Sequence, residues 1–119
     1  MNQIRQIKVL IEKGDYAGAQ ELIADQEEII SLLIEEYNAA GIKHRRTGRY
    51  EEAIREFRKA LVVLPRDEGL YYNLARTFID KGAWREAAET IDEGMKVNPD
   101  FTESIKLLKY IREHGWSAD

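Results

Sequence analysis

The chain has 119 residues and a formal net charge of −4; 44% of its residues are hydrophobic, 34% are charged, and none is cysteine. This length allows one compact domain or a short repeat array and excludes two independent domains of ordinary size. The composition is that of an ordered helical protein, the acidic balance argues against general affinity for nucleic acid, and the lack of cysteine excludes disulfides, thiol nucleophiles and cysteine zinc sites.

The N-terminal part of the chain predicts two helices of unequal length. Apolar residues recur every three or four positions through residues 2–13, which is the spacing of one helix face, and Gly14 ends this helix. Asp15 caps a shortened second helix. Charged residues interrupt the apolar ones, unlike a secretion signal, and no run approaches the roughly 20 apolar residues that span a bilayer. We therefore expect a cytoplasmic protein without a membrane partner.

A long helix is expected next, from near Gln26 to about Arg46. Asp25 and Glu28 have the spacing of a capping box at its start, in which each side chain accepts a hydrogen bond from the other residue's backbone N–H. The helix boundaries between residues 24 and 34 stay open, because the repeat pattern is irregular there and part of the segment is too apolar for a loop.

Four further helices follow, separated by glycine or proline turns. The first spans residues 50–63, the second runs from a cap at Asp67 to Gly82, and the third spans residues 84–97. The last helix spans residues 101–114. Proline ends two of these helices because it has no N–H to donate and disfavours helical geometry at the residue before it.

The last helix is expected to begin at a capping box formed by Asp100 and Glu103 and to end at Gly115. The apolar side chains expected to stay partly exposed near this end are Leu107, Tyr110 and Trp116. Exposed apolar surface of this kind can mark a self-association interface, or the point at which a longer array continues.

The stretch from Gly48 to Pro65 recurs 34 residues later, between Gly82 and Pro99. In both copies an aromatic residue opens the helix, and a small, large and small residue at i, i+4 and i+7 share one helix face. The small residues let a neighbouring helix approach closely while the large one fills the gap. These sets are Ala53, Phe57 and Ala60 in one copy and Ala87, Ile91 and Gly94 in the other.

This 34-residue helix–turn–helix period resembles the tetratricopeptide repeat family. The family's first helix carries an aromatic residue and, four positions later, a small one; here these are Tyr37 with Gly41 and Tyr71 with Ala75. The resemblance implies an all-α, right-handed superhelical array in which each hairpin buries its apolar face on its neighbours. The single domain 1–119 would comprise a degenerate repeat at 1–33, full repeats at 34–67 and 68–101, a capping helix at 101–114 and a tail at 115–119.

In this family the first helices line a concave surface, so the resemblance implies a non-catalytic protein-interaction module with a scaffold or adaptor role. Its groove would hold a peptide or partner helix. Cations in the groove would pair with carboxylates of an acidic partner, while tyrosines would supply apolar contact. The residues placed in this groove are Arg5, Lys8, Asn38, Ile42, Arg45, Tyr72, Asn73, Arg76, Lys106 and Tyr110.

Some members of the family bind chaperone tails through a two-carboxylate clamp of Lys, Asn and Arg side chains on successive first helices. Asn73 matches one clamp position. Asn38 and Ile42 stand where the clamp has Lys and Asn, and Leu107 stands where it has Arg. The match is partial, which argues against chaperone-tail binding.

No other motif points to chemistry. The basic run 43–49 fits a helix C-terminus, where cations complement the helix dipole, better than a phosphate or nucleic-acid site. His44 and His114 are the only histidines and have no ligand pattern beside them. We expect no enzyme activity, cofactor, metal or nucleic-acid partner. Two alternatives stay open: a structural module that self-associates through its terminal helix, and an accessory or regulatory domain of a larger enzyme or signalling protein.

Overall fold

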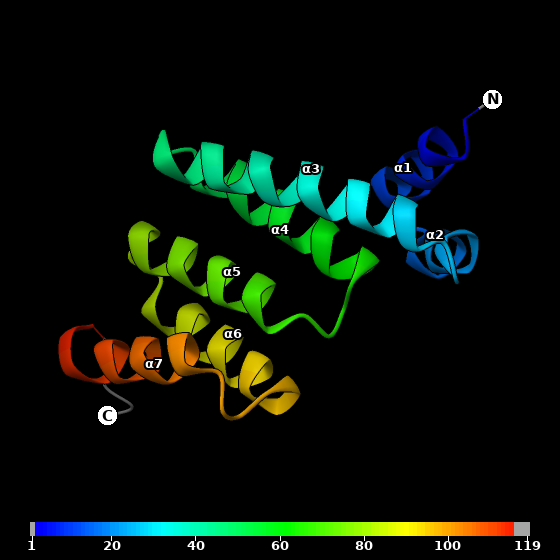
Figure 1. Ribbon diagram of the computed structural model, residues 1–119. Coiled ribbons are helices and arrows are strands. Elements are labelled where there is room, and N and C mark those ends of the chain that lie inside the picture. Colours follow the sequence, from blue (N-terminus) through cyan, green and yellow to red (C-terminus); the bar gives the residue numbers. More distant parts are fainter. Residues whose placement is uncertain (1, 116–119) are drawn as a thin grey trace.

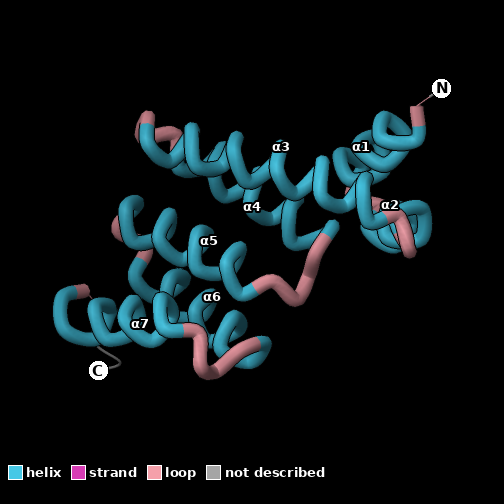
Figure 2. The backbone as a smooth tube through the Cα atoms, viewed as in Figure 1, coloured by secondary structure: helices cyan, strands magenta, loops and turns pink. Residues whose placement is uncertain are grey.

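The computed structural model describes residues 2–115, and this part of the chain forms seven α-helices and no strand (Figure 1). Short loops join the helices (Figure 2). The tail expected at 115–119 lies outside the described residues except for Gly115. The helices are α1 (Gln3–Lys13), α2 (Tyr16–Ile23), α3 (Glu27–Arg46), α4 (Tyr50–Val63), α5 (Glu68–Lys81), α6 (Trp84–Val97) and α7 (Thr102–His114).

The helices pack as successive hairpins. α1 contacts α2, α3 contacts α4, α5 contacts α6, and α7 lies against both α5 and α6. The shortened second helix and the extended third helix are confirmed, because α2 has 8 residues and α3 has 20. The molecule is elongated, at 51 × 30 × 21 Å, with its first and last helices at opposite ends (Figure 1).

Three glycines set the 34-residue period of the turns. Gly14, Gly48 and Gly82 have φ angles of 82°, 79° and 86°, in the left-handed region that glycine enters without a steric penalty. Gly14 and Gly82 are the C-caps of α1 and α5 and donate backbone hydrogen bonds back into the last helical turn. The chain therefore reverses direction at the places that the sequence predicts.

Two predicted N-caps are confirmed. The Asp15 side chain accepts a hydrogen bond of 3.0 Å from the N–H of Gly18 at the start of α2. The Asp67 side chain accepts one of 2.9 Å from the N–H of Leu70 at the start of α5. Each satisfies a backbone donor that has no partner inside the helix.

The two predicted capping boxes are wrong. Asp25 has a φ of 63°, so it turns the chain before α3, and Gln26 is the N-cap without a side-chain hydrogen bond. At α7 the N-cap is Phe101, one residue after Asp100. The N–H of Asp100 donates to the side chain of Asn98 (3.1 Å), which holds this residue in the turn. In both cases the helix begins one residue later than the capping box requires.

These caps give a paired prediction. Asp67→Ala is expected to lower the free energy of unfolding by about 1 kcal/mol, because the N–H of Leu70 loses its acceptor. Asp100→Ala makes the same chemical change at a position that caps nothing, so its effect should stay within about 0.5 kcal/mol. Urea unfolding followed by circular dichroism measures both. Equal losses would contradict the assignment of the caps.

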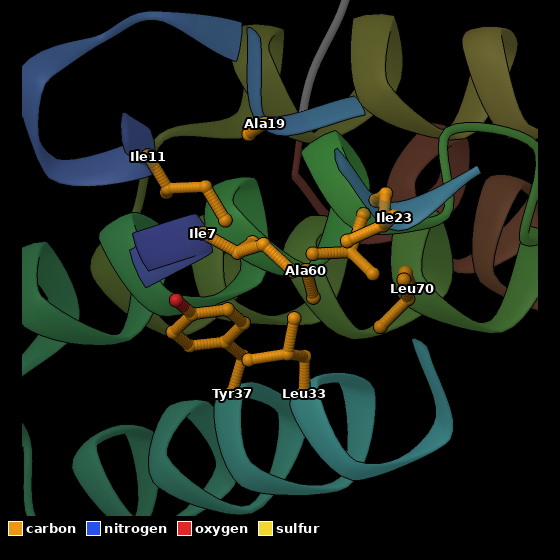
Figure 3. Packing of buried hydrophobic residues seen from close by; sticks show 9 residues of the cluster. Ile7, Ile11, Ala19, Ile23, Leu33, Tyr37, Ala60 and Leu70 are labelled. Carbon is orange, nitrogen blue, oxygen red and sulfur yellow. The ribbon is translucent and has the colours of Figure 1, made fainter. Parts of the chain in front are cut away.

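The interior consists of two clusters of buried apolar side chains, one toward each end of the chain. Figure 3 shows the N-terminal cluster, in which Leu33 and Tyr37 of α3 point toward Ile7 of α1 and Ala60 of α4. The C-terminal cluster joins α4, α5, α6 and α7. Its members are Ala53, Ile54, Phe57, Leu74, Ala75, Phe78, Ala87, Ile91 and Ile111.

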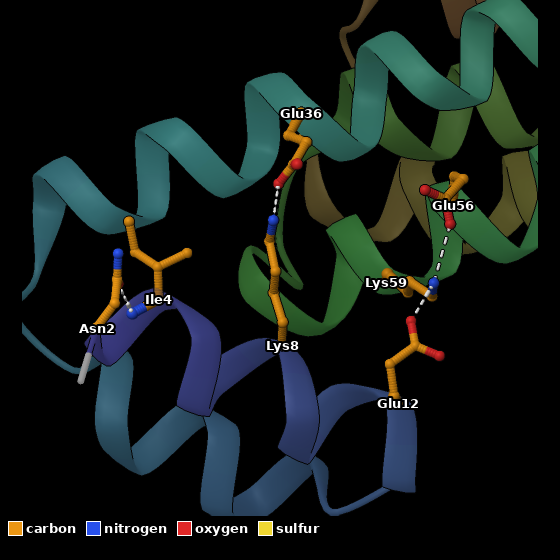
Figure 4. Close-up of polar contacts among 7 residues, drawn as sticks. All are labelled: Asn2, Ile4, Lys8, Glu12, Glu36, Glu56 and Lys59. Carbon is orange, nitrogen blue, oxygen red and sulfur yellow. Dashed lines mark hydrogen bonds and ion pairs between the residues drawn. The ribbon is translucent and has the colours of Figure 1, made fainter.

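A charged bridge covers the N-terminal cluster. Lys59 of α4 pairs with Glu12 of α1 and with Glu56 on its own helix (Figure 4). Burial alone would lower the pKa of Lys59, but the hydrogen bonds to the two carboxylates outweigh it and the pKa is raised. Its ammonium also lies 5.8 Å from the ring centre of Tyr37, whose pKa burial raises to about 12. The bridge holds the first hairpin against the second.

Candidate functional site

One face of the molecule is formed by the first helix of each hairpin together with α7. α3 contacts α5, α5 contacts α7, and these three helices follow one another across the molecule in Figure 1. α1 reaches the same face through Lys8, whose ammonium pairs with Glu36 of α3 at 2.6 Å (Figure 4). We call the surface of α1, α3, α5 and α7 the first-helix face.

The first-helix face is hollowed between α5 and α7. This α5–α7 hollow has a volume of about 340 Å³. Its apolar part consists of aliphatic and tyrosine side chains, and its polar part contains two cations and two carboxylates. It is lined by Tyr72, Arg76, Ile79, Asp80, Glu103, Lys106, Leu107 and Tyr110.

Aromatic contacts hold the two tyrosine rings of this hollow in place. The Tyr72 ring meets Phe101 edge to face, with ring centres 6.3 Å apart, and the Arg76 guanidinium lies 6.0 Å from the Tyr72 ring centre. On α7, Tyr110 stacks on His114 with ring centres 4.4 Å apart. Such contacts restrict the rings, so that less conformational entropy is lost when a ligand packs on them.

Polar side chains join α3 to α5 next to this hollow. Asn73 donates a hydrogen bond of 2.9 Å to the side-chain oxygen of Asn38. Arg45 and Asp80 form an ion pair at 3.6 Å. The Arg45 side chain is only 14% exposed, and its Nε is buried without a hydrogen-bond partner among the described residues. Arg45 therefore fastens two helices and neutralises Asp80, instead of offering a free cation to a partner.

A second hollow lies between α1 and α3 on the same face. This α1–α3 hollow has a volume of about 490 Å³, and Leu32, which is 55% exposed, lies at its edge. Leu32 also lines an adjoining hollow beside the start of α3, together with Glu27, Glu28 and Ser31. The α1–α3 hollow is lined by Ile4, Lys8, Leu32, Leu33, Glu35, Glu36 and Ala39.

The structure distributes the ten predicted groove residues over the first-helix face. Tyr72, Arg76, Lys106 and Tyr110 meet in the α5–α7 hollow, and Lys8 lines the α1–α3 hollow. Asn38, Asn73 and Arg45 form the polar connection between α3 and α5. Ile42 is half-buried against the C-terminal cluster, and Arg5 is exposed outside both hollows.

Four residues that line the α5–α7 hollow are not among the predicted groove residues, namely Ile79, Asp80, Glu103 and Leu107. Asp80 lies four residues after Arg76, and Glu103 lies three residues before Lys106. Residues at these spacings share a helix face, which is the signal that could have found them. Their carboxylates make the hollow mixed in charge and less basic than the sequence analysis expected.

Residues 2–115 contain neither a metal-binding cluster nor a membrane-spanning helix. No group of three or more histidine, cysteine, aspartate or glutamate side chains in this part of the chain is placed to hold a metal ion. None of its helices combines the length and the apolar character that crossing a membrane requires.

Comparison with known proteins agrees with this architecture. The family described as Tetratricopeptide repeat matches residues 45–109, which is more than half of the chain. Two relatives from Plasmodium falciparum, both named Hsp70-Hsp90 organising protein and one from isolate 3D7, are each 33% identical over 75 residues. These alignments cover 63% of this chain but only 29% and 13% of the relatives, so the chain spans less than a third of their length. The chain belongs to the tetratricopeptide repeat family.

Proposed function

We propose that this chain is a non-catalytic adaptor that binds a segment of a partner protein on its first-helix face. Membership of the tetratricopeptide repeat family supports a protein-interaction module. The observation that carries the finer proposal is the α5–α7 hollow, where four of the predicted groove residues meet beside the apolar side chains of Ile79 and Leu107. The division into a degenerate first repeat, two full repeats and a closing helix is part of this proposal, as is a cytoplasmic location.

The chemistry of the α5–α7 hollow favours a partner segment with both an apolar and an acidic side chain. Ile79, Leu107 and the two tyrosine rings offer apolar contact. Asp80 is already paired with Arg45, whereas Arg76 and Lys106 form no ion pair among the described residues. Glu103 forms no ion pair among these residues either, so the free charges of the hollow are two positive and one negative, which is positive on balance. A carboxylate next to a buried apolar anchor is the complementary ligand.

The names of the matched relatives raise the chaperones Hsp70 and Hsp90 as candidate partners. The side chains at the clamp positions do not favour a double-carboxylate clamp. Asn38 is hydrogen-bonded to Asn73, Ile42 is half-buried and apolar, and Leu107 is an apolar residue that lines the hollow. We therefore propose that the ligand is an internal acidic and apolar segment, with no requirement for a terminal carboxylate.

A matched pair of lysines on α7 tests this proposal. A library of random 12-residue peptides displayed on phage is selected against the full chain, and the enriched peptides are synthesised for titration. Lys106→Glu is expected to weaken their binding about tenfold, or about 1.4 kcal/mol, because it reverses a charge in the hollow. Lys109→Glu makes the same change outside the hollow and should alter Kd less than twofold. Equal effects of the two variants would contradict the proposed site.

Self-association through α7 is the second candidate function, because Ile105 remains 47% exposed. The same helix also argues against it. Ala75 and Phe78 lie on α5, and the equivalent positions on α7, 34 residues later, are Lys109 and Arg112. Charged side chains there leave the outer face of α7 suited to water, as the closing helix of an array requires. Light scattering at high concentration decides the question, since a monomer mass would exclude self-association.

A further inference from the structure

The two hollows of the first-helix face occupy equivalent places in the array. Ile4 and Lys8 of α1 stand 68 residues, or two periods, before Tyr72 and Arg76 of α5. Each pair lines the hollow between its own helix and the next first helix. The intervening step, between α3 and α5, is bridged by the Asn38–Asn73 hydrogen bond. The face thus has two openings with a polar bridge between them.

The charges at the two hollows are opposite. In the α1–α3 hollow the only cation, Lys8, is paired with Glu36, and Glu35 forms no ion pair among the described residues. This carboxylate stands beside the exposed apolar side chain of Leu32. In the α5–α7 hollow, Arg76, Lys106 and Glu103 form no ion pair among the described residues, so two positive charges and one negative charge are free. One end of the face therefore suits a basic ligand group, and the other end suits an acidic one.

The polar bridge between the hollows suits the backbone of a ligand. The single hydrogen bond between the two asparagines uses one amide N–H and one amide oxygen. The remaining two amide atoms, the nitrogen of Asn38 and the oxygen of Asn73, form no hydrogen bond among the described residues. A donor and an acceptor side by side match the N–H and C=O groups of an extended peptide.

The spacing of the helices sets the length of such a ligand. Leu32 and Glu35 of the α1–α3 hollow lie on α3, and Lys106 of the α5–α7 hollow lies on α7; α3 contacts α5, and α5 contacts α7. Helices in contact lie about 8–10 Å apart, so the two steps from α3 to α7 span about 16–20 Å. An extended chain advances about 3.3 Å per residue. Two side chains of one extended segment that reach both hollows are therefore about five or six residues apart.

Building on the proposed function, we propose that the partner segment is a single extended chain with two anchors of opposite charge. A Lys or Arg next to an aliphatic residue binds the α1–α3 hollow, against Leu32 and Glu35. An Asp or Glu next to an aromatic or aliphatic residue binds the α5–α7 hollow, about five or six residues away. The two asparagines hold the backbone between the anchors.

The phage-selected 12-residue peptides test this inference. They are expected to share a basic–aliphatic pair and an acidic–apolar pair at the stated spacing. Leu32→Lys is expected to weaken binding of the same peptide whose binding Lys106→Glu weakens, with at least a tenfold rise in Kd. The substitution removes an apolar contact and places a cation opposite the basic anchor of the peptide. Val9→Lys is the matched control: Val9 is 45% exposed on α1 and lines neither hollow, so binding should not change. Thermal melting of each variant verifies that it is folded.

Each outcome decides between the inference and the proposed function. The inference holds if Leu32→Lys and Lys106→Glu each weaken binding of the same peptide, and if replacing the basic anchor of that peptide by Glu also weakens its binding. If only Lys106→Glu weakens binding, the two-anchor inference is overturned while the proposed function stands. If only Leu32→Lys matters, if neither does, or if no peptide is enriched, both are overturned.

Discussion

Phe57→Ala is expected to lower the free energy of unfolding by about 3–5 kcal/mol, because the ring is fully buried in the C-terminal cluster and packs against Gly41 of α3. Its loss removes apolar burial and leaves a cavity that surrounding helices fill only partly. Urea unfolding monitored by circular dichroism measures the change. The loss is large relative to the 5–15 kcal/mol that a small domain typically has in total.

An exposed aromatic residue provides the control for this substitution. Tyr16 at the start of α2 is 51% exposed, so Tyr16→Ala removes a ring without opening an interior cavity. Its effect should be no more than about 1 kcal/mol. A loss of similar size for both variants would contradict the central position of Phe57 in the fold.

Gly41→Ala is expected to destabilise the wild-type chain by about 1–3 kcal/mol, although alanine favours helices over glycine by about 1 kcal/mol. A Cβ at Gly41 would lie 2.6–2.9 Å from three ring carbons of Phe57. Because the Phe57 ring is fully buried, it has no room to move away. The clash therefore outweighs the gain in helix propensity.

The sign of this effect should reverse when the ring is absent. In the Phe57→Ala background the added methyl group meets no ring, so Gly41→Ala should stabilise the chain by up to about 1 kcal/mol. The four proteins form a double-mutant cycle that isolates the contact between α3 and α4. If Gly41→Ala changes the free energy of unfolding in the same direction in both backgrounds, the result would contradict the close contact between these helices.

Sequence alone predicts the helices of this protein well because glycine and proline lie at the turns that separate them. Gly14 and Gly82 take the left-handed conformation expected of C-caps, and the small–large–small sets are buried as predicted. The failed capping boxes show the limit of local patterns. Asp25 and Asp100 have the spacing of caps, but the path of the loop places each one before the N-cap.

The site is less predictable than the fold. Repeat position identifies which residues belong to the first-helix face, and it predicts four residues of the α5–α7 hollow: Tyr72, Arg76, Lys106 and Tyr110. Repeat position does not reveal which charged side chains form ion pairs with a neighbouring helix. The pairing of Arg45 with Asp80 depends on the packing of α3 on α5, which changes the charge of the groove.

The most direct test of the proposed binding face is the titration of the ¹⁵N-labelled chain with an enriched peptide, followed by amide chemical shifts. Binding on the first-helix face predicts that the shifts change on α3, α5 and α7, with the largest changes around Tyr72, Arg76 and Lys106. The outward residues of α4 and α6 should stay unchanged. Changes concentrated on α4 and α6 would contradict the proposed site and move binding to the opposite side of the array.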